Sequence, residues 1–312
     1  MIFKHKVGPL IIQTVVAIPG IRIGNFDPIT PLGKSFHKFE TKQSGRSLRI
    51  HFLPGSNGQA SRRPVDATLW RRIPPSNRFP AEIADIELSD LSLFNDFFQT
   101  YLQATEDRLR GVFIEFKWNA IVCSDFMKRK IIVFMNPPTR FDKITLMLGP
   151  SLIAPFFTIY DALIVHGAGM LRNGKTILFM APDEGGKTTA VRLSEKSDIL
   201  CDDHVLLCRE GDAIRADGTP WGLYANPISS PLGALFFLEK ADAFGLEEIS
   251  STTALLRTWH EHTAYYIRCP KEFRIRAFDI FRHISRSVPN YRMRFPKDYI
   301  DWDAVDRAME KG

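Results

Sequence analysis

The hydrophobic pattern of the first 138 residues is that of short strands with irregular connections. The runs that read as strands are Leu10–Val16, Leu48–Leu53, Val112–Phe116, Ala120–Cys123 and Lys130–Phe134. Pro54–Phe79 is rich in Pro, Gly, Ser, Asn and Arg and is typical of a loop, whereas Leu88–Leu109 has apolar residues at helical spacing. The Asn-Pro-Pro sequence ending at Pro138 interrupts the pattern. We therefore expect a β-rich N-terminal domain over residues 1–138.

From residue 139 onward, short apolar strands alternate with amphipathic helices. The expected strands are Ala162–His166, Thr176–Met180, Ile199–Cys201, Val205–Cys208, Ala213–Ala216, Leu232–Leu238 and Tyr291–Phe295. The expected helices are Ile144–Tyr160, kinked at Pro155, and Thr188–Leu193, Thr252–His262, Phe273–Ser287 and Asp301–Glu310. Asn173-Gly174 predicts a tight hairpin, because both residues tolerate positive φ. The pattern indicates an α/β fold with a second domain over residues 139–312.

Composition narrows the class of protein. Apolar residues make up 45% and charged residues 24% of the 312 residues, and no apolar run is long enough to cross a membrane. The N-terminus does not have the pattern of a signal peptide, so we expect a cytoplasmic protein. The four cysteines lack the spacing of a structural zinc site, and we expect reduced thiols. The net charge of +6 fits an anionic ligand, but no basic run interleaved with aromatic residues points to nucleic acid.

A phosphate-binding loop is the clearest chemical motif. Ala181–Thr188, with the sequence Ala-Pro-Asp-Glu-Gly-Gly-Lys-Thr, matches the P-loop (Walker A) pattern G-x-x-x-x-G-K-[ST] at every defined position but the first. It lies between an apolar strand and a helix, where its backbone N–H groups would bind phosphate oxygens. Lys187 would neutralise phosphate charge and the Thr188 hydroxyl would bind Mg²⁺. The predicted nucleotide-binding residues are Asp183, Glu184, Gly185, Gly186, Lys187, Thr188 and Thr189.

Two features of this loop depart from the usual pattern. Ala181 replaces the first glycine, which costs roughly 1–2 kcal/mol if the position needs positive φ and little if it is still extended. Asp183 and Glu184 bring negative charge to a phosphate site. At about 8 Å and an effective dielectric constant of about 20, each would repel one phosphate charge by roughly 2 kcal/mol unless it turns to solvent. The alternative reading is a Gly-Gly-Lys-Thr turn without function.

Two acidic residues and one histidine accompany the loop. Asp202 and Asp203 follow the short strand Ile199–Cys201, where a Mg²⁺ ligand is expected beside a P-loop strand. One carboxylate would bind the metal, and the other would accept the proton of an attacking hydroxyl. The Asn173-Gly174 hairpin should bring His166 close to the nucleotide. Trp221, between Pro and Gly, would either wall a substrate pocket or pack in a turn.

The order of these motifs resembles the catalytic domain of HPr kinase/phosphorylase, whose P-loop core is shared with ATP-dependent phosphoenolpyruvate carboxykinase. The quoted segments are His166-Gly167, Asn173-Gly174, Gly185–Thr188 and Leu200–Asp203, within residues 145–225. Segments Gly218–Gly222 and Val288–Phe295 resemble divergent relatives of that family, some of which phosphorylate a serine of a lasso-peptide precursor and others small hydroxyl compounds.

The resemblance implies an ATP- and Mg²⁺-dependent serine kinase. Lys187 would act on the phosphates, Thr188 and Asp202 would bind the metal, and Asp203 would be the general base, held by His166. The favoured acceptor is a peptide or protein hydroxyl, and the N-terminal domain would take part in recognising it. The resemblance is also compatible with a homo-oligomer. Alternatives are a small-molecule kinase, a non-catalytic nucleotide-binding regulator and a carboxykinase-like lyase.

Overall fold

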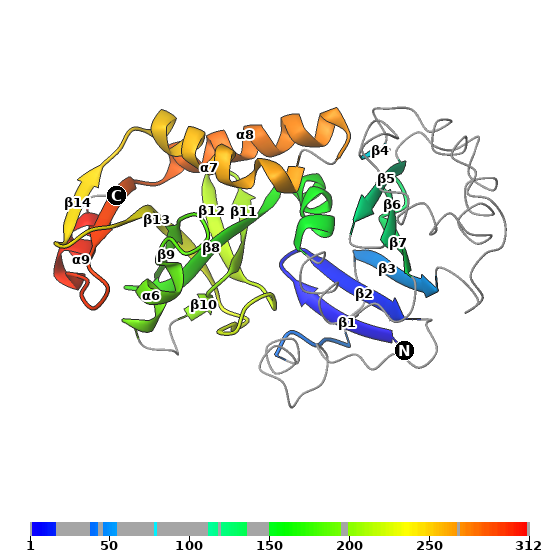
Figure 1. Cartoon of the computed structure of the whole chain (residues 1–312), viewed down its shortest axis with the longest axis horizontal. Helices are drawn as coiled ribbons and strands as arrows, with labels where there is room; N and C mark the ends of the chain where they lie inside the picture. Colours follow the sequence, from blue (N-terminus) through cyan, green and yellow to red (C-terminus); the bar gives the residue numbers. More distant parts are fainter. Residues whose placement is uncertain are drawn as a thin grey trace.

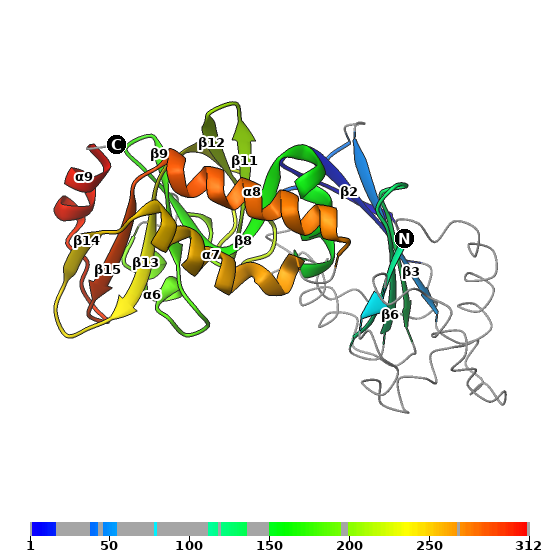
Figure 2. The same cartoon turned by 90° about the horizontal axis from the view of Figure 1, so that it is seen from above.

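The computed structural model describes residues 2–16, 38–42, 46–54, 78–79, 112–117, 120–135, 150–194, 199–266 and 269–310. These residues form a mixed α/β structure built on two sheets (Figures 1 and 2), which confirms the predicted class at that level. The predicted domain boundary at residue 138 and the predicted helix Leu88–Leu109 lie outside the described residues. So does nearly all of the predicted loop Pro54–Phe79, in which the structure describes only Pro54, Arg78 and Phe79. The division into two domains therefore stays a prediction.

The first sheet is formed by the N-terminal half of the chain. Its strands are β1 (Ile2–Val7), β2 (Leu10–Val16), β3 (Ser47–Pro54), β4 (Arg78–Phe79), β5 (Val112–Lys117), β6 (Ala120–Asp125) and β7 (Lys130–Met135). They lie in the order β1-β2-β3-β7-β6-β5-β4. The three predicted strands between Val112 and Phe134 are present, and they form a meander, since β5, β6 and β7 pair antiparallel in succession. β1 was not predicted; it pairs antiparallel with β2 along the full length of β1.

Two long strands of the second sheet each pair with different neighbouring strands along their length. Its strands are β8 (Ala162–Arg172), β9 (Lys175–Met180), β10 (Ile199–Cys201), β11 (His204–Glu210), β12 (Ala213–Gly218), β13 (Ser229–Lys240), β14 (Gly245–Glu248) and β15 (Asn290–Phe295). The first half of β8 pairs with β11 and its second half with β9. The start of β13 pairs with β12 and its remainder with β9 and β15. This closes a ring of strands, β8-β11-β12-β13-β9.

Helices cover both faces of the part of the sheet that contains β9 and β13. They are α6 (Lys187–Arg192), α7 (Ser251–Tyr266), α8 (Lys271–Ser287) and α9 (Trp302–Glu310). Successive strand residues point to opposite faces. Leu178 and Met180 accordingly pack in the cluster that holds α7 and α8, whereas Ile177 and Phe179 pack in the one that holds α6 and α9. Strands buried on both faces read as apolar runs, which is why Thr176–Met180 was recognisable.

The turn between β8 and β9 has the predicted chemistry. Asn173 has φ 51° and Gly174 has φ 76°, both in the left-handed region, and Arg172 pairs with Lys175 across the turn. Positive φ at both central residues is the requirement of a type I′ hairpin. Upstream, residues 150–157 form a helix that continues through Pro155 and ends in the 3₁₀ turn η5 (Thr158–Tyr160).

Side chains of the N-terminal half contact the second half at turns and at helix α8. Lys38 Nζ donates hydrogen bonds to the carbonyl of Ala225 (2.9 Å) and to Oδ1 of Asn226 (2.8 Å). The Phe126 ring lies 4.4 Å from the Phe273 ring of α8, between centroids. Figure 2 shows β2 beside the helix at residues 150–157. The two halves of the described chain therefore share part of their core.

Candidate active site

Several strand ends converge on one cleft of about 1110 Å³. β9, β13 and β15 run parallel, so the residues that follow them lie at the same edge of the sheet. β8 is antiparallel to β9 and pairs Gly167 with Met180, which places His166 beside the end of β9. All ten predicted site residues line this cleft: His166, Asp183, Glu184, Gly185, Gly186, Lys187, Thr188, Thr189, Asp202 and Asp203. Trp221 also lines it, although its ring is almost fully buried.

The backbone of the loop explains why alanine is tolerated at its first position. Ala181 does not have positive φ, so the extended case applies and the residue carries no backbone strain. Its side chain is buried, and a Cβ added to Gly185 would lie only 2.5 Å from the Cβ of Ala181. The left-handed residues of the loop are instead Glu184, with φ 61°, and Gly186, with φ 101°.

The two acidic side chains of the loop point to solvent. Glu184 is exposed, and the Asp183 side chain is 92% exposed. Oδ1 of Asp183 lies 3.6 Å from Nε2 of His166, so this carboxylate faces a group that can carry positive charge. Exposure to water weakens the repulsion between these carboxylates and a bound phosphate. The loop therefore accommodates both acids at a smaller cost than the sequence alone indicated.

Lys187 lies beneath the loop at the start of α6. Its Nζ donates hydrogen bonds to the carbonyl oxygens of Ala181 (2.6 Å) and Pro182 (3.0 Å), and the residue is 7% exposed. Burial lowers the pKa of Lys187, and the negative charges of Asp183, Asp203 and Glu261 oppose that shift. The ammonium group of Lys187 is therefore held by backbone carbonyls of the Ala181–Thr188 loop.

Asp202 is a buried carboxylate anchored by the backbone. It is 7% exposed, and its Oδ1 accepts a hydrogen bond from the Tyr224 N–H at 3.0 Å. Burial raises the pKa of Asp202. A Cβ on Gly222 would lie 2.5 Å from Oδ1 of Asp202, so only glycine fits over this carboxylate. A nearby cation would offset the cost of keeping the carboxylate ionised.

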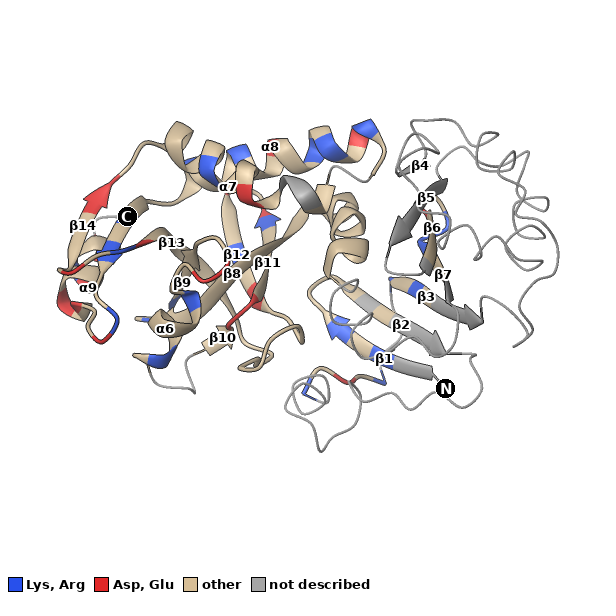
Figure 3. Cartoon of the chain, in the orientation of Figure 1, with Lys and Arg blue, Asp and Glu red and all other residues tan. Residues whose placement is uncertain are grey.

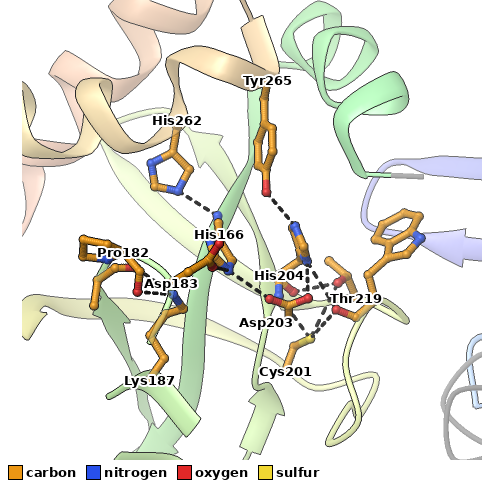
Figure 4. Close-up of polar contacts among 12 residues, drawn as sticks. His166, Pro182, Asp183, Lys187, Cys201, Asp203, His204, Thr219, His262 and Tyr265 are labelled. Carbon is orange, nitrogen blue, oxygen red and sulfur yellow. Dashed lines mark hydrogen bonds and ion pairs between the residues drawn. The ribbon is translucent and has the colours of Figure 1, made fainter. Parts of the chain in front are cut away.

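Asp203 lies between two histidines (Figure 4). Its Oδ1 is 3.0 Å from Nε2 of His166, and its Oδ2 is 3.0 Å from Nδ1 of His204. Burial would raise the pKa of Asp203, but the hydrogen bonds and charges of the two imidazoles outweigh it and hold that pKa well below its usual range. The predicted contact between His166 and Asp203 is therefore present, and Asp203 is ionised at neutral pH.

Helix α7 supplies two residues that contact His166 and His204 and hold them in place (Figure 4). His262 is fully buried, and its Nε2 accepts a hydrogen bond from the backbone N–H of His166 at 2.7 Å. Nδ1 of His262 therefore carries the proton, which it donates to the Thr258 carbonyl at 2.8 Å. Nε2 of His204 lies 2.8 Å from the Tyr265 hydroxyl. His204 therefore spans from the Asp203 carboxylate to the Tyr265 hydroxyl.

His204, His262 and Tyr265 surround the Asp203 carboxylate and were not assigned a role from the sequence. His204 had a local signal, because it directly follows Asp202 and Asp203. His262 and Tyr265 contact residues 96 and 61 positions away along the chain, and no local pattern reports such contacts.

The donor groups fit a hard cation. The Thr188 hydroxyl and the Asp202 carboxylate both line the cleft, and Mg²⁺ prefers such oxygen ligands together with waters and phosphates. Within the described ranges, no group of three His, Cys, Asp or Glu side chains forms a metal site by itself. All four cysteines are free and buried, as predicted. None of the described helices is long and apolar enough to cross a membrane.

Comparison with known proteins gives one family. Among solved structures, the Hpr(Ser) kinase/phosphatase from Coxiella burnetii is 11% identical, and the alignment covers 47% of this chain and 93% of that chain with a TM-score of 0.25. No curated protein matches the chain. The family model described as "SynChlorMet cassette protein ScmC" matches residues 136–310, which is more than half of the 312 residues and includes every residue of the cleft. The chain therefore belongs to the ScmC family.

Proposed function

We propose that this protein is an ATP- and Mg²⁺-dependent kinase that transfers the γ-phosphoryl group to a serine-type hydroxyl. The observation that carries the proposal is the position of the Asp203–His166 pair, which lines the same cleft as the Lys187 loop. The Lys187 loop would hold the phosphates, and the Asp203–His166 pair would hold the attacking hydroxyl. The favoured acceptor is a serine of a peptide or protein, as in the lasso-peptide precursor kinases that the motif order resembles.

The phosphate end of the site would work by positioning and charge. Backbone N–H groups of residues 183–188 would bind phosphate oxygens, and Lys187 would neutralise negative charge that develops during transfer. Thr188 and Asp202 would hold Mg²⁺, which when bound screens the phosphate charge. The buried position of Asp202 favours a role in metal binding, since its carboxylate is already fixed by the Tyr224 N–H.

The acceptor end would work through Asp203. As the bond from the acceptor oxygen to phosphorus forms and the bond from phosphorus to the leaving oxygen breaks, Asp203 would accept the acceptor's proton. A low pKa makes Asp203 a weak base, but phosphoryl transfer passes through a loose transition state in which orienting the hydroxyl matters more than removing its proton early. His166 and His204 would fix the direction of the carboxylate.

A second hypothesis is a nucleotide-binding regulator without catalysis. The observation that favours it is the pair of hydrogen bonds from Lys187 to its own loop, since the ammonium group has to leave Ala181 and Pro182 to reach a phosphate. Tight ATP binding without a phosphorylated product from any acceptor pool would support this hypothesis over the kinase.

The test is phosphate transfer from ATP. The protein is incubated with MgATP and with separate pools of peptides and of small hydroxyl compounds, and the products are analysed by mass spectrometry for an added phosphate. Asp203→Asn should lower the transfer rate by about 10²- to 10⁴-fold, the usual contribution of a positioned base. Asp212→Asn, in the exposed turn between β11 and β12, is the control for the same charge change. Full transfer activity in Asp203→Asn would contradict the assignment of the base.

A further inference from the structure

The cleft extends past the P-loop on the side away from Asp203. There it is lined by two short segments that follow β13 and β15, which we call the β13–β15 shoulder. The shoulder consists of Lys240, Ala241, Asp242, Phe295, Pro296 and Lys297. None of these residues was assigned a role by the motif, and the proposed transfer chemistry does not use them.

Strand register explains why the shoulder stands beside the loop. β9 ends at Met180, which pairs with Phe237, whereas β13 continues to Lys240, which pairs with Phe295. At about 3.3 Å per residue, the three additional residues carry β13 about 10 Å beyond the end of β9. The Ala241 N–H donates to the Phe295 carbonyl at 3.1 Å, so the two segments remain joined past the strand ends.

The shoulder also touches the loop directly. Phe295 is buried, and a Cβ on Gly186 would lie 3.0 Å from its Cζ. Ala241 and Pro296 are partly exposed and present small apolar surfaces to the cleft. Lys240, Asp242 and Lys297 are exposed around them, and Figure 3 shows charged residues of both signs at this end of the molecule. Apolar surface edged by a few polar groups is the usual lining of a small-molecule site.

The order of the strands sets the direction of a bound nucleotide. Asp202 and Asp203 lie on the β8 and β10 side of the P-loop, and the shoulder lies on the β13 and β15 side. A γ-phosphate placed for transfer has to face Asp203, so the remainder of the nucleotide extends toward the shoulder. A triphosphate alone would leave that end of the 1110 Å³ cleft unfilled.

We propose that the β13–β15 shoulder binds the nucleoside half of the nucleotide, with the Asp242 carboxylate accepting hydrogen bonds from the ribose hydroxyls. In this arrangement Ala241 and Pro296 contact the base, and Lys240 and Lys297 lie near the phosphate closest to the ribose. The inference rests on the proposed nucleotide site, and it names the residues that distinguish a nucleotide from an inorganic polyphosphate.

The experiment measures binding by calorimetry, without acceptor, for three ligands in the presence of Mg²⁺: ADP, 2′,3′-dideoxy-ADP and tripolyphosphate. Asp242→Asn should weaken ADP binding about tenfold, which corresponds to one hydrogen bond worth about 1.4 kcal/mol. It should leave tripolyphosphate binding unchanged. Because Asn keeps only one of the two acceptor oxygens, the variant should prefer ADP over dideoxy-ADP less strongly than the wild type does. Asp298→Asn is the matched control, since Asp298 is exposed on the segment that continues from the shoulder and does not line the cleft.

Each outcome has a definite meaning. A preference for ADP over dideoxy-ADP that is as large in Asp242→Asn as in the wild type would overturn the assignment of Asp242. Tripolyphosphate binding as tight as ADP binding in the wild type would overturn the subsite while leaving the phosphate loop and the kinase proposal in place. If neither ligand bound the wild type, the phosphate site itself would be wrong, and the subsite would fall with it.

Discussion

Protonation of His262 should make the protein less stable as the pH falls from 7 to 5. His262 is fully buried, and burial lowers the pKa of its imidazole to about 4, because the charged form would lose its hydration. In the unfolded chain the pKa of a histidine is about 6.5. The unfolded state therefore binds the proton first, and the stability contributed by neutral His262 is present above pH 6.5 and is lost as the pH falls toward 4. Between pH 7 and pH 5 the loss amounts to about 2 kcal/mol.

The assay is urea unfolding followed by tryptophan fluorescence at several pH values between 5 and 7.5, for the wild type and for His262→Gln. At pH 7 the variant should be less stable by about 1–3 kcal/mol, since the His166 N–H loses its acceptor. Its stability should nevertheless depend less on pH, so that the gap between the two proteins narrows by about 2 kcal/mol at pH 5. Other groups titrate in both proteins and cancel in the difference. Parallel stability curves over this range would refute the argument.

Two further predictions test the loop and the Asp203 environment separately. Gly186→Ala should destabilise the protein by about 1–2 kcal/mol because of its φ of 101°, and by more because the new Cβ would contact Phe295. Gly174→Ala, with φ 76° and open space around it, should show the backbone effect alone. Equal shifts in melting temperature for the two variants would rule out the contact. Tyr265→Phe should lower kcat for phosphate transfer by about three- to tenfold with KM for ATP unchanged, because His204 loses one hydrogen bond that orients it. Nitrogen chemical shifts of the His204 ring should change in the same variant, and an unchanged kcat would exclude a positioning role.

The gathering of the motif residues around one cleft was predictable because they follow short patterns in the sequence. The Gly-Gly-Lys-Thr motif and the Asp202-Asp203 pair each follow a short apolar strand, and the ends of neighbouring strands meet at one edge of a sheet. His166 could be placed because Asn173-Gly174 specifies a two-residue hairpin, which fixes the pairing of β8 with β9. In each case the information lies within about ten residues of the residue concerned.

The remainder depended on contacts between distant segments. The backbone conformation of Ala181 could not be read from its residue type, because alanine is disfavoured but not forbidden at positive φ; the structure shows that its φ is not positive. Among the described strands, β14 pairs only with β15, and its sequence Gly-Leu-Glu-Glu has little strand propensity, so its tertiary partner specifies it. Lys240 and Asp242 look like ordinary surface residues until the register of β13 with β15 places them at the cleft.

Helix α7 determines the geometry of the Asp203 carboxylate from both sides. His262 and Tyr265 are three residues apart, so they project from the same face of the helix. Their rings meet edge to face with centroids 6.1 Å apart. His262 accepts a hydrogen bond from the backbone of His166, and Tyr265 contacts the ring of His204. The two histidine rings in turn contact one oxygen each of Asp203. Any shift of α7 along the sheet would therefore move both hydrogen-bond donors together. The orientation of the Asp203 carboxylate consequently depends on how α7 packs against β8 and β11, and not only on the Asp-Asp turn that is recognisable in the sequence.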